Sequence, residues 1–352
     1  MYMKKNVLIF LQSGIGGAER VSVTIGKNLN REKFNVTFCC VGERNNSIER
    51  FIPPSFRIVY MDVKNPVMQI WLYIKKISEE KPDIVFASVI NINNKVLLSR
   101  LFFPKVRFVV RSDNNVNVFS RLQQMMIRFT YKFADCIIAQ TIEMAEGLVE
   151  ITKINRRKIV VLANPIDESY INDHMQNAVS PYEDNGNIHY VASGRFAESK
   201  GFDLLVKAFL IVHKKNPKTD LHILGKTGGM NNKVFRTVEN FVRNNSLLNS
   251  VFFTGQLENP YPYIKFADCF VLSSRYEGLP NVLLESLYLQ TPVAAFKCIP
   301  IIERLVQDGT NGYTANAENI ESLAEAMENS CLLGRVINRY KSASAYEFEK
   351  LF

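Results

Sequence analysis

The sequence of 352 residues lacks the features that mark several common classes of protein. No apolar run approaches the roughly 18–20 residues that a membrane-spanning helix needs. There is no low-complexity tract or internal repeat of the kind that fibrous, disordered or solenoid proteins carry. The six cysteines show no C-x-x-C spacing and lie mostly in apolar, strand-like runs. We therefore expect reduced, buried thiols and predict no metal site.

Histidine is also scarce. The four histidines all follow residue 168, and no Ser-His-Asp or Cys-His arrangement is evident. At the N-terminus, Lys4 and Lys5 precede a short apolar run that leads into a glycine-rich turn rather than a cleavage site. This run is too short for a signal peptide, so we interpret it as a first strand and predict a cytoplasmic protein.

The net charge of +9 is unevenly distributed along the chain. Residues 1–168 carry 25 Lys or Arg and 15 Asp or Glu, whereas residues 169–352 carry 18 and 19. The basic excess thus belongs to the N-terminal half. Such asymmetry indicates an anionic partner for that half, which can be membrane lipid, nucleic acid or a phosphorylated acceptor.

Short apolar runs alternate with helical patterns throughout the chain, which predicts βα units and parallel sheets. In the first half we expect strands at Val7–Leu11, Asn35–Val41, Ile58–Met61, Ile84–Ala87, Arg107–Arg111, Cys136–Ala139 and Ile159–Leu162. In the second half we expect strands at His189–Ser193, Asp220–Leu224, Val251–Thr254, Cys269–Ser273 and Pro292–Phe296. The fold class is therefore α/β, with two doubly wound, Rossmann-like domains facing a cleft in which the ligand would bind.

We place the domain boundaries from this alternation. Residues 1–168 form the N-terminal domain, residues 169–187 read as a polar linker, and residues 188–334 form the second domain. The stretch 335–352 has a helical pattern, and we expect it to cross back onto the first domain.

Three segments follow predicted strands and have the composition of ligand-binding loops. The first contains Gly14, Gly16 and Gly17, which would let the backbone approach a ligand at a helix N-terminus. It is not the dinucleotide fingerprint, because Glu19 occupies the third glycine position. The alternative is a plain tight turn.

The second segment runs from Gly194 to Gly201 and carries two cations. Arg195 and Lys200 could both reach a diphosphate, Arg through a planar fork and Lys through a compact charge. The alternative is a solvated loop with two surface cations.

The third segment, Ser274–Glu285, is the most informative. Pro280 fits the first position of a helix, whose unpaired N–H groups and dipole favour a phosphate. Glu277 and Glu285 flank this position, and ionised carboxylates accept hydrogen bonds from hydroxyl groups. Two glutamates at this spacing arise readily by chance, but this context predicts a site for a sugar nucleotide.

Taken together, these segments resemble the retaining glycosyltransferases of the GT-B fold, and within them family 4. The resemblance covers nearly the whole chain and rests on Gly14–Arg20, Asn164–Asp167, Gly194–Gly201, the pair Glu277 and Glu285, and Asp308–Tyr313. It implies an enzyme of two Rossmann-like domains that transfers a sugar from a nucleotide diphosphate.

The resemblance also implies roles for individual residues. Arg195 and Lys200 would bind the diphosphate and stabilise it as it leaves. Glu277 would bind hydroxyls of the transferred sugar, and Glu285 would hold the ribose hydroxyls. Transfer with retention would proceed by attack on the face from which the diphosphate departs.

The remaining donor-binding residues would contribute backbone groups. Those implied by the resemblance are Gly16, Gly17, Gly278, Leu279, Asn281 and Val282. No metal or other cofactor is expected, because cationic side chains and the helix dipole would stabilise the diphosphate.

The sequence departs from the family pattern on the acceptor side. Many members place a histidine after the strand that corresponds to Arg107–Arg111, whereas here the chain continues with Ser112 and Asp113. Arg111 or Asp113 would serve instead. The loop after Phe296, usually glycine-rich, reads Lys-Cys-Ile-Pro.

The donor is expected to be a UDP-hexose or UDP-N-acetylhexosamine, with GDP-mannose as the alternative. The acceptor would be a glycan or a glycan linked to polyprenyl diphosphate, in polysaccharide biosynthesis. The basic first domain would then dock on anionic lipid at the inner face of the cytoplasmic membrane, through candidates Arg100–Phe103, Lys105, Arg107, Arg121, Arg128 and Lys132. A soluble domain with ordinary surface lysines is the alternative.

Three other functions remain. A sugar-nucleotide epimerase would share the fold, and a non-catalytic sugar-nucleotide-binding protein would keep the pocket. A nucleic-acid-binding protein would explain the charge, but no recognisable binding module is present, so no nucleic acid is expected as a partner.

Overall fold

The computed structural model describes residues 3–14, 16–42, 48–62, 69–337, 340 and 342–352. The chain divides into two compact units. Unit 1 comprises Met1–Ile166 together with Ser342–Phe352, and unit 2 comprises Asp167–Lys341.

The described part of unit 1 contains a seven-stranded parallel sheet in the order β3-β2-β1-β4-β5-β6-β7. Its strands are β1 Lys5–Gln12, β2 Phe34–Val41, β3 Arg57–Met61, β4 Ile84–Ala87, β5 Arg107–Arg111, β6 Cys136–Ala139 and β7 Ile159–Val161. Central strands such as β4 are buried along their whole length, which explains their continuous apolar sequences. The strand order reverses between β1 and β4, as in doubly wound folds.

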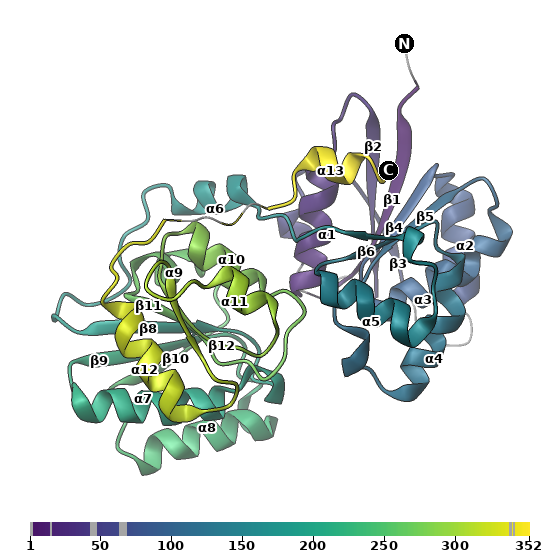
Figure 1. The fold of residues 1–352 in the computed structure, drawn as a ribbon. Helices are drawn as coiled ribbons and strands as arrows, with labels where there is room; N and C mark the ends of the chain where they lie inside the picture. The colour runs from purple at the N-terminus through teal and green to yellow at the C-terminus, as the bar shows by residue number, and fades with distance from the viewer. Residues whose placement is uncertain (1–2, 15, 43–47, 63–68, 338–339, 341) are drawn as a thin grey trace. The chain divides into compact units, whose positions relative to one another are not determined.

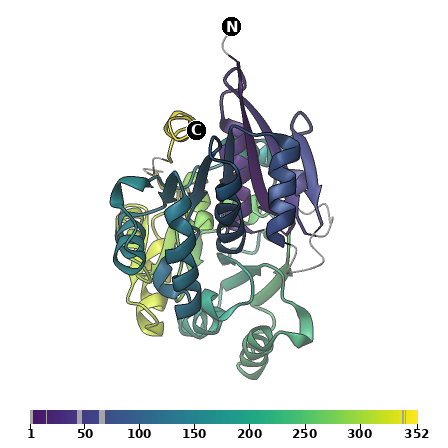
Figure 2. The ribbon, with the colours of Figure 1, turned by 90° about the vertical axis from the view of Figure 1, so that its right-hand side faces the viewer.

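Helices cover both faces of this sheet (Figures 1 and 2). One face is buried by α2 Gln69–Glu80, α3 Ile90–Ser99, α4 Arg121–Thr130 and α5 Ile142–Thr152. The other face is buried by α1 Gly17–Asn28 and by α13 Ala345–Glu349, from the far end of the chain.

Helix α13 is tied to unit 1 by packing and by polar contacts. The ring of Phe352, just after the helix, lies 5.6 Å from that of Phe86 between ring centroids. Lys5 Nζ donates to the Phe352 carbonyl at 3.0 Å, and Arg107 Nε donates to the Leu351 carbonyl at 2.8 Å. The C-terminal segment Ser342–Phe352, which is remote in sequence from the rest of unit 1, thus completes the core of this unit.

Unit 2 contains, in its described residues, a six-stranded parallel sheet in the order β10-β9-β8-β11-β12-β13. Its strands are β8 Ile188–Ser193, β9 Thr219–Leu224, β10 Val251–Gly255, β11 Cys269–Leu272, β12 Val293–Phe296 and β13 Gly312–Ala315. The order reverses between β8 and β11, so the loops that leave these two strands flank a switch point.

The helices of unit 2 also lie on both sides of the strands. The main core is formed with α7 Phe202–Lys215, α8 Lys233–Asn244 and α12 Ile320–Cys331. Figure 1 shows α9 Tyr261–Phe266, α10 Asn281–Tyr288 and α11 Ile301–Leu305 on the side of the strands away from α7 and α8. The prediction of two Rossmann-like α/β domains is therefore confirmed.

Two elements differ from the sequence predictions at the domain boundaries. The stretch 169–187, predicted as a linker, contains most of helix α6 Glu168–Met175. Asp167 caps this helix by accepting from the Tyr170 N–H, and Ile171 is its buried residue. The polar sequence hid this helix because only one of its side chains enters the core.

The helix predicted over 335–352 is much shorter. Helix α13 begins after Ser344, which with Glu347 forms a capping box, and ends at Glu349. Residues 338, 339 and 341 of the predicted helix lie outside the described residues.

Smaller differences concern single elements. Pro280 precedes α10 as its N-cap, one position earlier than predicted. Strand β13 and helix α11 were not predicted, since each is only four or five residues long. Among the described residues, no helix combines the length and the apolar character that crossing a bilayer requires.

Candidate functional site

The loops after β8 and β11 meet at the switch point of unit 2. Gly201, which precedes α7, adopts a left-handed conformation with φ of 59°, and an added Cβ would lie 2.1 Å from the Ser273 carbonyl oxygen. Ser273 Oγ in turn donates to the Lys200 carbonyl at 2.9 Å. This close approach of the two loops requires glycine at position 201.

Lys200 and Glu277 form an ion pair across these loops. Lys200 Nζ lies 2.5 Å from Glu277 Oε1, and Ser274 Oγ donates to the same oxygen at 2.7 Å. Both charged side chains are largely shielded, with exposed fractions of 23% and 12%. The stem of Lys200 passes over Gly194, where an added Cβ would lie 3.3 Å from the lysine side chain.

Residues 278–280 connect Glu277 to the N-terminus of α10. Gly278 and Leu279 are buried, and Val282 is half-buried in the first turn of the helix. The backbone N–H groups of these three residues donate to no group in the part of the chain that the structure describes. Unpaired N–H groups at a helix N-terminus form a seat for an anion.

The other predicted donor-binding residues of unit 2 lie on the same elements. Asn281 is the first residue of α10, and Glu285 is buried on the same helix with an exposed fraction of 9%. Arg195 is exposed on the loop after β8, and its side chain makes no hydrogen bond or ion pair with any described residue. Arg195 is therefore a cation available to a ligand.

Arg275 holds the two loops in place. Its guanidinium binds Asp203 at the start of α7 through two hydrogen bonds of 2.8 and 2.7 Å, and it binds Glu318 at 3.1 Å. Its backbone N–H donates to the Ser199 carbonyl at 2.8 Å. These bonds with Asp203 raise the pKa of Arg275. Burial acts to raise the pKa of Asp203, but these bonds and the positive charge of Arg275, with smaller contributions from its own backbone and Lys207, together lower it.

Cys298, on the loop after β12, is electrostatically coupled to the ion pair. Burial raises the pKa of its thiol to about 12, the negative charge of Glu277 adds to this, and Lys200 opposes it. The loop that departs from the family's glycine-rich pattern thus brings a neutral thiol close to Glu277.

In unit 1, the glycine segment leads into α1 as predicted from the sequence. Gly16 is the N-cap of α1, and Gly17 is its first residue. A Cβ at Gly16 would lie 2.3 Å from Glu19 Oε2, so the absence of a side chain lets the buried Glu19 fold over this turn.

Arg111 lies at the end of β5 within a buried polar web. Its guanidinium donates to Ser88 Oγ at 2.7 Å and to Asn164 Oδ1. Asn164 also donates to Gln140 Oε1 at 3.0 Å. With an exposed fraction of 2%, Arg111 orders the ends of four neighbouring strands.

Asp113 follows on the same loop and is half-buried. Burial raises the pKa of its carboxyl, and the positive charge of Arg111 opposes this shift. A carboxyl with a raised pKa is a candidate general base or acid near neutral pH.

The structure therefore brings together Lys200, Glu277 and the start of α10, while Gly16, Gly17, Arg111 and Asp113 belong to the other unit. The sequence analysis missed Ser274 and Arg275. Their position inside the Ser274–Glu285 motif was the only available signal. Arg275 bonds residues more than forty positions away in the sequence, and Ser274 bonds Glu277, three positions on, so neither contact forms a recognisable sequence pattern. Among the described residues, no three His, Cys, Asp or Glu side chains gather in a way that could hold a metal ion.

The fold of both units and this arrangement at the switch point define a glycosyltransferase of the GT-B class. Residues 15–170 match the sequence family described as Glycosyltransferase Family 4, and residues 177–343 match Glycosyl transferases group 1. The chain belongs to these glycosyltransferases and is an enzyme of that class.

Individual relatives agree with this assignment. The chain is 28% identical to an uncharacterized glycosyltransferase of Methanocaldococcus jannaschii, over 67% of this chain and 62% of that protein. It is 25% identical to a Campylobacter jejuni N-acetylgalactosamine-N,N'-diacetylbacillosaminyl-diphospho-undecaprenol 4-alpha-N-acetylgalactosaminyltransferase, over 99% of this chain and 97% of that enzyme. Among solved structures, Anabaena HepE in complex with UDP-glucose is similar in fold, with a TM-score of 0.79 at 17% identity over 98% of this chain and 97% of that one.

Proposed function

We propose that this enzyme transfers a hexose or N-acetylhexosamine, with retention of configuration, from UDP to a glycan or lipid-linked glycan in polysaccharide biosynthesis. The observation that carries the proposal is the Lys200–Glu277 pair beside the unpaired N–H groups of Gly278, Leu279 and Val282 at the start of α10. A sugar diphosphate requires a positive side chain and unpaired N–H groups to bind its phosphates, and a carboxylate that accepts hydrogen bonds from the sugar hydroxyls. The Anabaena neighbour in complex with UDP-glucose supports the choice of UDP.

The chemistry of the donor site follows from these contacts. Breaking the bond between sugar and phosphate builds negative charge on the departing diphosphate. Arg195, Lys200 and the N–H groups of Gly278, Leu279, Asn281 and Val282 would stabilise that charge. Glu277 Oε1 already accepts from Lys200 and Ser274, so Oε2 is the oxygen that would accept from a sugar hydroxyl.

Further residues of both units would complete the donor and acceptor contacts. Glu285 would accept from the ribose hydroxyls, and the backbone of Gly16 and Gly17 would approach the donor phosphates. On the acceptor side, the raised pKa of Asp113 suits a group that receives the acceptor's proton, with Arg111 fixing its loop.

The acceptor would be carried by a lipid. The Campylobacter relative acts on an undecaprenol-linked glycan by its name, and residues 1–168 of this chain carry the basic excess that an anionic bilayer attracts. The enzyme would then work as a peripheral protein at the inner face of the cytoplasmic membrane. Transfer would need no metal, because fixed cations and N–H groups supply the positive charge.

A panel of UDP- and GDP-sugars, assayed for nucleotide release with and without lipid-linked acceptors, tests this function. We expect acceptor-dependent UDP release that EDTA does not reduce, and a product of unchanged anomeric configuration by NMR. Acceptor-independent conversion of the UDP-sugar to its epimer would instead establish an epimerase.

Variants test the assigned residues in the same assay. Removing a preorganised electrostatic group costs about 10²–10³ in kcat, and we expect losses of this order for Arg195→Ala, Lys200→Ala and Glu277→Ala. Lys214→Ala, an exposed lysine at the end of α7, is the matched control. Turnover near that of the wild type in all three site variants contradicts the assignment.

A further inference from the structure

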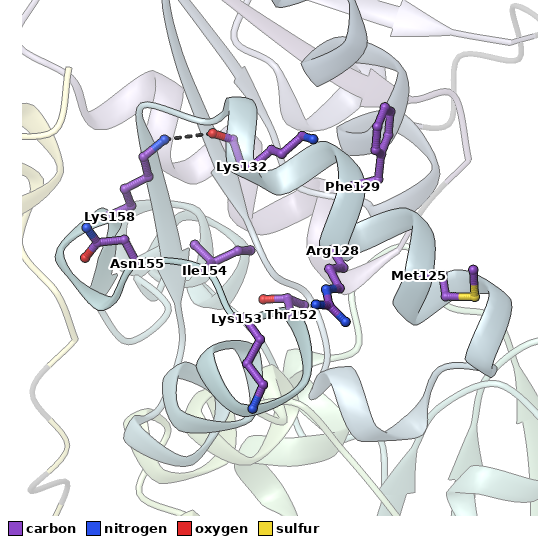
Figure 3. Close-up of a pocket in the computed structure, with 9 residues that line it drawn as sticks. All are labelled: Met125, Arg128, Phe129, Lys132, Thr152, Lys153, Ile154, Asn155 and Lys158. Carbon is purple, nitrogen blue, oxygen red and sulfur yellow. Dashed lines mark hydrogen bonds between the residues drawn. The ribbon is translucent and has the colours of Figure 1, made fainter.

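A cavity of about 600 Å³ opens on unit 1, away from the strand ends described above. Its lining comes from α4 and the turn after it on one side, and from the end of α5 and the loop that follows on the other (Figure 3). Four of its nine lining residues are cationic and none is acidic: Arg128, Lys132, Lys153 and Lys158. The volume lies within the range of small-molecule sites.

The cations of this cavity are not neutralised by the protein. None of the four forms an ion pair with any carboxylate of the described residues. Lys158 Nζ donates to the carbonyls of Lys132 and Ala134, at 2.8 and 2.9 Å, which fixes it at the cavity wall. Lys132 Nζ lies 4.4 Å from the centroid of the Phe129 ring. A cluster of unpaired positive charges attracts an anion.

Helix α4 carries its apolar stripe on the outside. It packs on unit 1 through Ile127 and Thr130. Four apolar residues at helical spacing along this stripe are exposed, by 69% for Leu122, 67% for Met125, 44% for Met126 and 55% for Phe129. A helix with an exposed apolar stripe next to basic residues is typical of proteins that lie in the interface of a bilayer.

The cavity and the stripe share residues, because Met125 and Phe129 belong to both. We infer that this cavity binds the phosphate headgroup of an anionic bilayer phospholipid, whose acyl chains lie along the exposed face of α4. Nucleic acid would use the charges but leave Leu122, Met125 and Met126 without a partner. The inference rests on the proposed function in one respect: an enzyme whose acceptor is linked to a membrane lipid needs a surface that binds the membrane.

The test is binding of the full-length protein to vesicles of phosphatidylglycerol mixed with phosphatidylcholine, and of phosphatidylcholine alone, at low and high salt. The cavity variant is Arg128→Gln with Lys132→Gln. The matched control is Lys214→Gln with Lys218→Gln, which removes the same charge from exposed positions of unit 2.

We expect the wild type and the control to bind phosphatidylglycerol vesicles, and the cavity variant to bind roughly tenfold or more weakly. Binding by the cavity variant equal to that of the wild type overturns the inference, because it means that the cations of the cavity do not hold the lipid. An equal loss by the control overturns it too, because it means that net charge alone decides. Binding of single-stranded RNA without any binding of vesicles overturns it as well.

A second variant reports where the lipid lies. Trp71, on α2, is the single tryptophan of the chain, so Trp71→Phe with Phe129→Trp places one fluorophore at the cavity. We expect brominated phosphatidylglycerol to quench it; unquenched emission in a vesicle-bound protein contradicts the inference. Turnover with a soluble glycan acceptor should survive in every variant, so that loss of lipid binding is distinguishable from failure of the proposed transferase activity.

Discussion

At the scale of single residues, Arg275 holds together the loops after β8 and β11, which form the proposed donor site. We predict that Arg275→Met lowers kcat by about 10- to 100-fold, because small displacements of positioned groups have effects of this size. Arg275→Lys should recover little, since a lysine cannot make the two parallel bonds to Asp203.

A double-mutant cycle distinguishes positioning from a general loss of stability. In a Lys200→Ala background, Arg275→Met should lower kcat far less than it does in the wild type. Full additivity of the two losses in free energy would contradict the positioning role.

His222 supplies a pH-dependent contribution to stability. Burial lowers its pKa from 6.5 to about 4, and the neighbouring His189 adds to the shift while Asp220 opposes it. The imidazole is therefore neutral in the folded state at pH values where it is already protonated in the unfolded chain. The contribution of the neutral His222 to the free energy of unfolding is complete above about pH 6.5 and is lost as the pH falls from 6.5 towards 4.

We predict that His222→Phe weakens this dependence. The new ring would keep the stacking on Phe252, whose centroid lies 4.7 Å from that of His222, but it cannot be protonated. Melting temperatures of both proteins between pH 7 and pH 4.5 should diverge, with the variant losing less. Parallel curves would assign the acid sensitivity to other groups.

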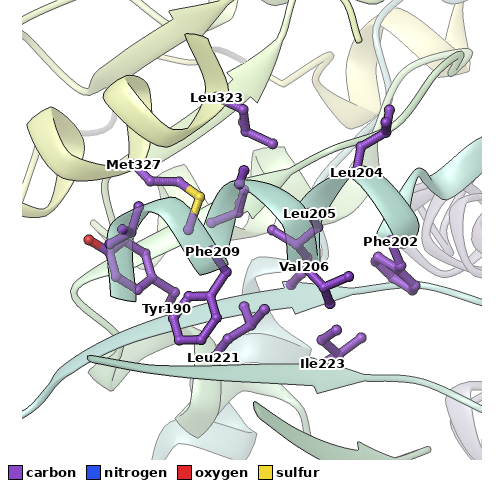
Figure 4. Close-up of a cluster of buried hydrophobic side chains, with 14 of the residues drawn as sticks. Tyr190, Phe202, Leu204, Leu205, Val206, Phe209, Leu221, Ile223, Leu323 and Met327 are labelled. Atoms are coloured by element: carbon purple, nitrogen blue, oxygen red, sulfur yellow. The ribbon is translucent and has the colours of Figure 1, made fainter. Parts of the chain in front are cut away.

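At the scale of elements, α7 anchors the core of unit 2. Figure 4 shows Phe209 on this helix directed at Tyr190 and the strands below. Phe209 is fully buried, so Phe209→Ala should cost about 3–5 kcal/mol in the free energy of unfolding. Lys207→Ala, an exposed change on the same helix, should cost little in the same urea titration. A loss below 1 kcal/mol for Phe209→Ala would mean that the core refills the space.

The elements also explain how far the sequence alone could lead. Strands β4, β5 and β6 were predicted to the residue. Strands β4 and β6 are continuous apolar runs because they are buried along their whole length, and β5 has a buried apolar centre between two arginines. Helix α6 was missed because Ile171 is its one buried side chain. Strand β13, four residues with only its ends buried, offers no such pattern.

The candidate site was predictable in its residue types rather than in its contacts. The Gly-Leu-Pro-Asn helix start and the cations of residues 194–201 indicated a diphosphate site. That Lys200 and Glu277 bond each other across 77 positions, and that Arg275 reaches Asp203, depends on the strand order that places β8 next to β11.

At the scale of the whole molecule, unit 1 is built from two separate stretches of chain. Phe352 is 4% exposed, and its ring lies 6.4 Å from Phe34 as well as 5.6 Å from Phe86. We predict that Phe352→Ala destabilises unit 1 by about 3 kcal/mol or more and leaves the unfolding of unit 2 unchanged.

Hydrogen exchange that resolves the two units checks this expectation. The control is Tyr346→Ala, because Tyr346 lies on the same helix and is 62% exposed. Equal protection of unit 1 in the wild type and in Phe352→Ala would contradict a structural role for α13.

The order of synthesis gives this arrangement a further meaning. Domains generally fold in turn as a chain leaves the ribosome, but the residues of α13 are translated only after all of unit 2. The apolar surface at Phe34 and Phe86, which Phe352 covers in the complete protein, therefore stays exposed while about 175 further residues are translated. Chaperone demand during translation should accordingly centre on that surface.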